Sequence, residues 1–148
     1  MTYSETQDGT YSATNPTYTN AGTYTVYYKV EKSGYNDATG SANVKIHKKS
    51  VTVSGLTAAE KTYDGSATSE LVATNAAYDG LLSGDSLSVT GTAVFADAEA
   101  GDSKTVNISG LALGGTSAGN YTLSSDTASG TGKITKRPIT ITAANQTD

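Results

Sequence analysis

Residues 44–53 read Val44-Lys45-Ile46-His47-Lys48-Lys49-Ser50-Val51-Thr52-Val53, and residues 132–141 repeat the pattern as Gly132-Lys133-Ile134-Thr135-Lys136-Arg137-Pro138-Ile139-Thr140-Ile141. Ile134 lies 88 residues after Ile46, and similarity at such a spacing is typical of repeat architectures. Each copy predicts a closing strand with the isoleucine, a short basic linker and an opening strand with alternating threonine. We therefore expect residues 1–47 to end a first β-repeat, residues 48–135 to form a complete repeat, and residues 136–148 to open a following one.

A second similarity links Asn20-Ala21-Gly22-Thr23-Tyr24-Thr25-Val26 to Ser117-Ala118-Gly119-Asn120-Tyr121-Thr122-Leu123. Here Tyr121 lies 97 residues after Tyr24, so the first copy is nine residues longer between its tyrosine and its closing isoleucine. The longer stretch, residues 27–38, predicts an extended hairpin that turns near residues 33–37.

Strand signals dominate the chain. Residues 24–30, 87–90, 92–95 and 105–108 mix β-branched and aromatic residues in near alternation, and glycine, asparagine and aspartate separate them. Only residues 57–61 and 69–75 are candidates for helical turns, and neither has a sustained helical period. The pattern predicts an all-β fold of tandem Ig-like β-sandwich modules, with β-grasp-like modules carrying one short helix as the alternative.

The alternation also predicts the core of the complete repeat. We expect most of it to come from Val51, Val53, Leu71, Leu87, Val89, Val94, Val106, Ile108, Leu111, Leu113, Tyr121 and Ile134.

Composition excludes several classes of protein. The chain of 148 residues is 36% hydrophobic and 16% charged, which fits neither a disordered tail nor a membrane protein, and we expect no membrane insertion. A net charge of -4 argues against nucleic-acid binding, and the one basic cluster comprises Lys29, Lys32, Lys45, Lys48 and Lys49. The absence of cysteine excludes disulfides, a thiol nucleophile and zinc–cysteine sites. No signal peptide follows Met1, so we expect any export signal to lie outside this sequence.

Several motifs in order carry a family resemblance. They are Lys61-Thr62-Tyr63-Asp64-Gly65, Ser83-Gly84-Asp85, Val94-Phe95-Ala96-Asp97, Ser109-Gly110-Leu111-Ala112-Leu113 and Gly119-Asn120-Tyr121-Thr122-Leu123. Over about residues 48–135 the chain resembles the YDG repeat of bacterial adhesins and cell-surface proteins. The stretches Asn20–Val30 and Gly34–Asp37 resemble, less specifically, the C-terminal part of a bacterial Ig-like or MBG-type extracellular repeat.

The resemblance implies a non-enzymatic structural or adhesive module of a bacterial cell-surface or secreted protein, acting as stalk or spacer. Its partners would be neighbouring repeats of the same chain. The alternative is an adhesin module that binds a carbohydrate or host protein through surface tyrosines. No catalytic, cofactor-binding or metal-binding residue comes with the resemblance, so we expect no cofactor, and no ligand-binding residue can be assigned.

The glycine motifs favour turns over ligand contacts. Tyr63-Asp64-Gly65 is expected to form an Asp-Gly turn with the tyrosine packed beneath it. We expect Gly65 or Gly119 to be harder to replace than any serine, because glycine can take positive-φ turn geometry that a β-carbon penalises. The same letters at residues 78–80 are expected in a loop over residues 78–85.

The titratable residues suggest no catalytic centre. Asp97, Glu99 and Asp102 are close in sequence but lack the ligand alternation of an EF-hand, which favours a solvated hairpin over a calcium site. His47 is the only histidine and is expected in a linker, and no G-x-S-x-G elbow accompanies the many serines.

The tyrosines cluster between residues 3 and 35. Alternation predicts Tyr24, Val26 and Tyr28 on a packed face, and leaves Tyr27 and Tyr35 as candidates for sugar stacking. At the other end, Pro138-Ile139-Thr140-Ile141-Thr142 is an opening strand without a repeat to join, so we expect strand-mediated self-association.

Overall fold

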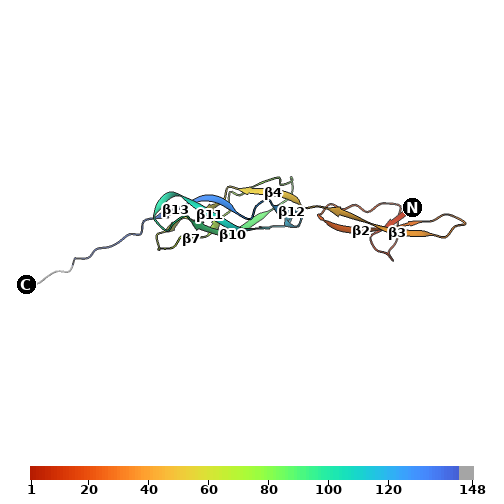
Figure 1. Ribbon diagram of the computed structural model, residues 1–148, viewed down its shortest axis with the longest axis horizontal. Helices are drawn as coiled ribbons and strands as arrows, with labels where there is room; N and C mark the ends of the chain where they lie inside the picture. The colour runs from red at the N-terminus through yellow and green to blue at the C-terminus, as the bar shows by residue number, and fades with distance from the viewer. Residues whose placement is uncertain (144–148) are drawn as a thin grey trace, which may run out of the picture.

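The computed structural model describes residues 1–143, and strands dominate them. The molecule is elongated: one group of strands occupies the N-terminal end, a second group follows, and the C-terminal segment leaves from the opposite end (Figure 1). In chain order the elements are β1 (Thr2–Ser4), β2 (Gly22–Val30), β3 (Ala38–Ile46), β4 (Lys49–Ser54), β5 (Thr57–Ala58), β6 (Lys61–Thr62), β7 (Thr68–Ser69), β8 (Leu71–Val72), β9 (Ala77–Asp79), β10 (Ser88–Phe95), β11 (Gly101–Gly114), the 3₁₀ turn η1 (Ala118–Asn120), β12 (Tyr121–Leu123) and β13 (Ala128–Thr135). The predicted all-β class is confirmed.

Strands β1–β3, called here the first unit, form an antiparallel sheet in the order β1-β2-β3. The predicted hairpin is confirmed, since β2 pairs with β3 from Gly22↔Ile46 to Val30↔Ala38 and the connection turns at Gly34, whose φ is 83°. This unit has little core: within it, only Val26 and Ser4 are buried.

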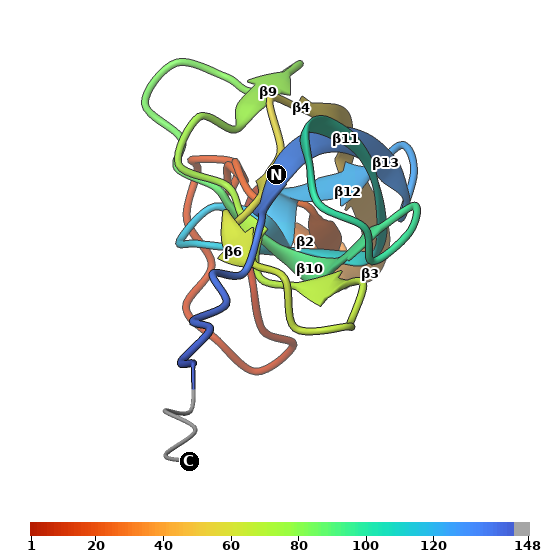
Figure 2. The same ribbon diagram turned by 90° about the vertical axis from the view of Figure 1, so that its left-hand side faces the viewer.

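Strands β4–β13, the second unit, form two sheets in a sandwich-like arrangement. A seven-stranded sheet has the order β7-β10-β11-β13-β5-β8, with β6 also on β13, and the smaller sheet has the order β12-β4-β9. Val53, Tyr78 and Leu123 of the smaller sheet pack against the core of the larger one. Figure 2, seen along the long axis, shows the strands wrapped around this core. A β-grasp fold needs a helix packed on a sheet, whereas η1 is the one helical segment among residues 1–143.

Most of the residues predicted for the core are buried, but in one strand the opposite face points inward. Buried side chains include the predicted Val51, Val89, Val106, Ile108, Leu111, Tyr121 and Ile134, together with Leu56, Ala58, Ala93 and Phe95, which were not predicted. Val53, Leu71, Leu87, Val94 and Leu113 are only half-buried. The prediction that Val94 belongs to the core was wrong. Val89, Ala93 and Phe95 share the inward face of β10, so Val94 lies on the other face.

A bulge explains why alternation misleads in the neighbouring strand. The pairs Thr90↔Ala112 and Thr92↔Ser109 show one extra residue in β11, next to Gly110 with a φ of 64°. Val106 and Ile108 are buried two residues apart, as alternation requires. The next buried residue is Leu111, three residues on, because the extra residue of the bulge reverses which positions of β11 face the core.

The strand register also shows which repeat positions are structurally equivalent. Gly22 pairs with Ile46 in the first unit, and Gly101 pairs with Ile134 in the second. Each glycine follows an alanine, and each closing strand ends with or just after its isoleucine. The similarity of residues 20–26 to residues 117–123 is therefore not structural: β2 pairs antiparallel with β3, whereas β12 pairs in parallel with β4.

Two smaller expectations are corrected. Residues 57–61 and 69–75 hold the short strands β5 to β8, not helical turns, because each pairs in the larger sheet. Residues 136–143 form no strand, because β-structure needs a paired neighbour and none lies beside them. The remainder of the predicted opening strand, residues 144–148, lies outside the described residues.

Candidate functional site: the junction between the two β units

The two units meet through the side chain of Asn120. Its Oδ1 accepts a hydrogen bond from the backbone N–H of Ala21 at 2.8 Å, and its Nδ2 donates to Oδ1 of Asn20 at 3.0 Å. Both partners directly precede β2, whereas Asn120 ends η1 and directly precedes β12. A short linker, His47 and Lys48 between β3 and β4, is the covalent connection. One amide side chain therefore bridges the units beside the linker.

A polar network holds this end of the second unit in place. The hydroxyl of the buried Tyr121 donates to the Asp85 carboxylate and accepts from the backbone N–H of Leu82 at 3.1 Å. Ser117 donates to the same carboxylate at 3.0 Å and accepts from the N–H of Ser86 at 3.1 Å. The Asp85 carboxylate, followed by burial, raises the pKa of Tyr121. The network joins the loop around residue 85 to η1, and so positions Asn120.

The units leave a cleft of about 380 Å³ between them. The first unit contributes Thr19, Asn20, Ala21 and Ile46, the linker contributes His47, and the second unit contributes Lys49, Leu82, Ser83, Asp85, Asn120 and Tyr121. His47 thus lies in the linker, as predicted. The lining offers hydrogen-bond donors and acceptors.

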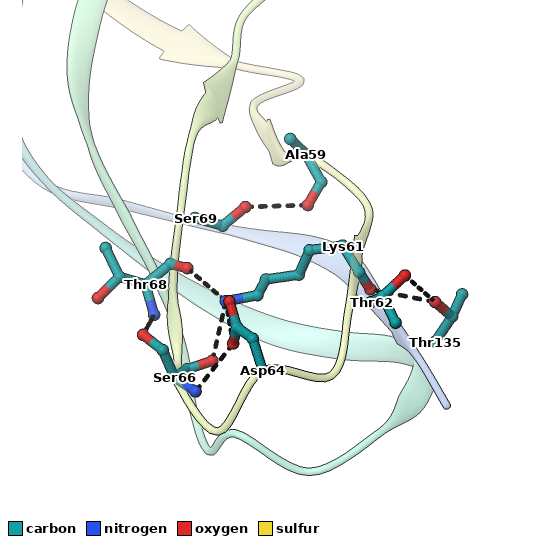
Figure 3. A network of polar contacts seen from close by, with 8 residues as sticks. All are labelled: Ala59, Lys61, Thr62, Asp64, Ser66, Thr68, Ser69 and Thr135. Atoms are coloured by element: carbon teal, nitrogen blue, oxygen red, sulfur yellow. Dashed lines mark hydrogen bonds and ion pairs between the residues drawn. The ribbon is translucent and has the colours of Figure 1, made fainter. Parts of the chain in front are cut away.

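The Tyr63-Asp64-Gly65 motif is a turn at the opposite end of the second unit. Asp64 accepts from the N–H of Ser66 at 2.9 Å and forms an ion pair with Lys61 at 2.8 Å (Figure 3). Lys61 also donates to the carbonyls of Ser66 and Thr68, and Gly65 has a φ of 80°. Lys61 lowers the pKa of Asp64. The turn is confirmed, but Tyr63 is 38% exposed and so does not pack beneath it.

A family model for the YDG domain matches residues 47–129. The chain belongs to the YDG domain family. No curated protein and no solved structure shows significant similarity to it. The match spans most of the second unit, called the YDG domain from here on, and the first unit lies outside it.

The remaining candidate residues of the YDG domain have structural partners. Tyr78 and Asp79 lie in β9, not in a loop, and only Gly80 begins the following turn, with a φ of 94°. Asp97 pairs with Lys104, which lowers the pKa of Asp97, and Asp102 pairs with Lys133 at 3.0 Å. Among residues 1–143, no three acidic, histidine or cysteine side chains form a group that could hold a metal ion.

The five lysines of the predicted basic cluster are distributed over two places. Lys29 pairs with Glu31 and Asp37 near the hairpin turn, where Lys32 lies 4.7 Å from the centre of the Tyr35 ring. Lys45, Lys48 and Lys49 lie at the junction end instead. Hairpin geometry separates residues that are close in the sequence.

The tyrosines of the first unit also take different places. Tyr18 and Tyr24 stack with ring centroids 3.9 Å apart, and Tyr35 is 70% exposed at the hairpin turn. Tyr27 and Tyr11 line an open hollow of about 370 Å³, together with Gln7, Asp8, Thr39, Gly40 and Ser41. Within the described part of the chain, no helix is long and apolar enough to cross a membrane.

Proposed function

We propose that the chain is a non-enzymatic structural module of a bacterial cell-surface or secreted protein, which acts as a stalk or spacer and is displayed outside the cell. The observation that carries this proposal is the end-to-end arrangement of two β units (Figure 1), which Asn120 bridges beside a short linker. A spacer must keep its two ends a fixed distance apart, and a bridged junction resists bending more than a free linker does.

The junction test uses the absence of cysteine. Thr39→Cys in β3 and Ala112→Cys in β11, both exposed, allow spin labels to be placed in the two units and their distance measured by double electron–electron resonance. We expect one narrow distance distribution. Asn120→Ala should broaden it, whereas Asn107→Ala, an exposed asparagine of the same domain within β11, should not. A broad distance distribution in the labelled chain that keeps Asn120 would contradict the spacer role.

The hollow between Tyr11 and Tyr27 supports a second candidate function, carbohydrate or host-protein binding. Aromatic rings beside amide, carboxylate and hydroxyl groups are the chemistry that recognises sugars. A glycan array on the full chain, and on the Tyr27→Ala variant, tests this candidate. Binding should be lost with Tyr27→Ala and kept with Tyr63→Ala, a matched change at an exposed tyrosine outside the hollow. An array without binding would argue against it.

A further inference from the structure

The far end of the YDG domain has a hollow of its own, where the C-terminal segment leaves. It has a volume of about 250 Å³ and is lined by Ala100, Gly101, Asp102, Lys133, Ile134, Thr135 and Lys136. We call these residues the distal face. Lys49, Leu82, Asp85, Asn120 and Tyr121, which meet the first unit, are the proximal face.

The distal face is built from the same parts that the first unit presents to the junction. Ala21, Ile46 and His47 line the junction cleft, and Ala100, Ile134 and Thr135 line the distal hollow. The strand register makes these residues equivalent, because Gly22↔Ile46 and Gly101↔Ile134 are the matching pairs. Val26↔Ala42 and Val106↔Gly130 match as well once the extra residue of β11 between Gly101 and Lys104 is passed, and both valines are buried.

The contacts that Asn120 makes have counterparts on the distal face. Ala100 takes the place of Ala21, whose N–H donates to Asn120. Glu99 takes the place of Asn20 and is exposed, so its carboxylate can accept from an amide as the Asn20 side chain does. The basic residues are kept too, since Lys133 and Lys136 replace Lys45 and Lys48.

Resting on the proposed function, we infer that the distal face is a docking surface for the proximal face of another YDG domain. Asn120 of the incoming domain accepts from the Ala100 N–H and donates to Glu99. The partner is a YDG domain that follows directly in tandem, because the first unit already covers the proximal face of the domain described here, and a separate copy of this chain therefore has no free proximal face to offer.

The test is an extended chain in which residues 48–135 are repeated once, directly after Thr135. This keeps the linker length, since Lys48 then occupies the position of Lys136. Spin labels at Ala112→Cys in both copies report the new junction, and labels at Thr39→Cys and at Ala112→Cys of the first copy report the original one. Docking predicts a narrow distance at the new junction. Free rotation there would give a broad distribution and overturn the inference.

The same substitution serves as test and control. Asn120→Ala in the second copy should broaden the distance distribution at the new junction and leave the original one narrow. Asn120→Ala in the first copy should broaden the distribution at the original junction and leave the new one narrow. A distance at the new junction that stays narrow with Asn120→Ala in the second copy would overturn the role of Asn120. A narrow original junction with a broad new one overturns only this inference, whereas a broad original junction overturns the proposed function itself.

Discussion

At the scale of single residues, glycine geometry sets the least tolerant positions of the YDG domain. Gly55 has a φ of 74°, and a Cβ there would lie 2.3 Å from the carbonyl oxygen of Asn75. Gly65 has a φ of 80° but open space around it. The prediction that Gly65 or Gly119 is harder to replace than any serine keeps its positive-φ reason at Gly65 only, because Gly119 lies in η1 without positive φ and a Cβ there meets nothing within 4 Å. A sequence pattern typical of turns does not by itself show which glycines have positive φ or a close backbone neighbour.

We therefore expect Gly55→Ala to be strongly destabilising and Gly119→Ala to be nearly neutral. Positive φ and a backbone clash together should cost about 2 kcal/mol or more of unfolding free energy at Gly55, while the Gly119 change should stay within about 0.5 kcal/mol. Urea unfolding of both variants measures the difference. Equal midpoints would contradict the geometry of the Gly55 turn.

A second prediction at this scale concerns pH. The folded-state pKa of Tyr121 is raised, mainly by the hydrogen bond to Asp85, above the ordinary value of about 10 for tyrosine. Its contribution to stability is therefore complete below about pH 10 and is lost as the pH rises through the folded-state pKa. Unfolding free energy should fall more steeply in this alkaline range for the unsubstituted chain than for Tyr121→Phe. Tyr63→Phe, at an exposed ring, should leave the slope unchanged, and a Tyr121→Phe slope as steep as that of the parent would count against the prediction.

At the scale of elements, the first unit is a sheet without a core of its own. Val26 is the one buried apolar side chain of β1–β3, and the strand positions of β3 are mostly exposed. Three strands need a hydrophobic face to be stable alone, and chains of this size seldom bury enough surface. The unit therefore lacks the buried apolar surface that independent stability needs, and the hydrogen bonds to Asn120 attach it to its neighbour.

We expect residues 1–47 in isolation to be unfolded, and residues 48–135 in isolation to unfold cooperatively. The separate core of the YDG domain, with Phe95, Ile108 and Ile134 almost fully buried, supports the second expectation. Circular dichroism melts of the two fragments provide the measurement. A sigmoidal thermal transition from residues 1–47 would show that the missing core is not needed.

At the scale of the whole molecule, the chain presents an open strand edge and an unpaired apolar segment. Strand β3 lies at the edge of its sheet, and Ile139 and Ile141 are each 90% exposed. An unpaired edge offers backbone donors and acceptors to another strand. We propose that the C-terminal segment of one copy pairs with the first unit of another, giving a head-to-tail contact that does not close by itself.

Deleting residues 137–148 should then abolish concentration-dependent association, as measured by sedimentation velocity over a range of protein concentrations. Thr140→Ser, which keeps both isoleucines, should leave association unchanged. The proposal fails if the chain of 148 residues, without the deletion, sediments as a strict monomer at the highest concentration.

Local pattern determined the class of this protein. Side-chain alternation and turn residues follow from the geometry of a single strand, so β-structure, the hairpin after Tyr24–Val30 and the ordered YDG motifs are visible in the sequence alone. Most of the predicted core was right for the same reason. Val94 was not, because the direction in which a strand faces depends on its neighbours.

Only the tertiary structure showed the strand pairing and the contacts between the two units, because a local sequence pattern carries no information on distant neighbours. The bulge at Gly110 changes the buried phase of β11, and only strand pairing shows that Gly22 corresponds to Gly101. The junction depends on Asn120 reaching Ala21 across 99 residues of sequence, a contact that no spacing in the chain encodes. Hydrogen bonds of this kind exist only once two separately ordered surfaces are brought together, and for that reason the candidate site, unlike the fold class, could not be predicted from the sequence.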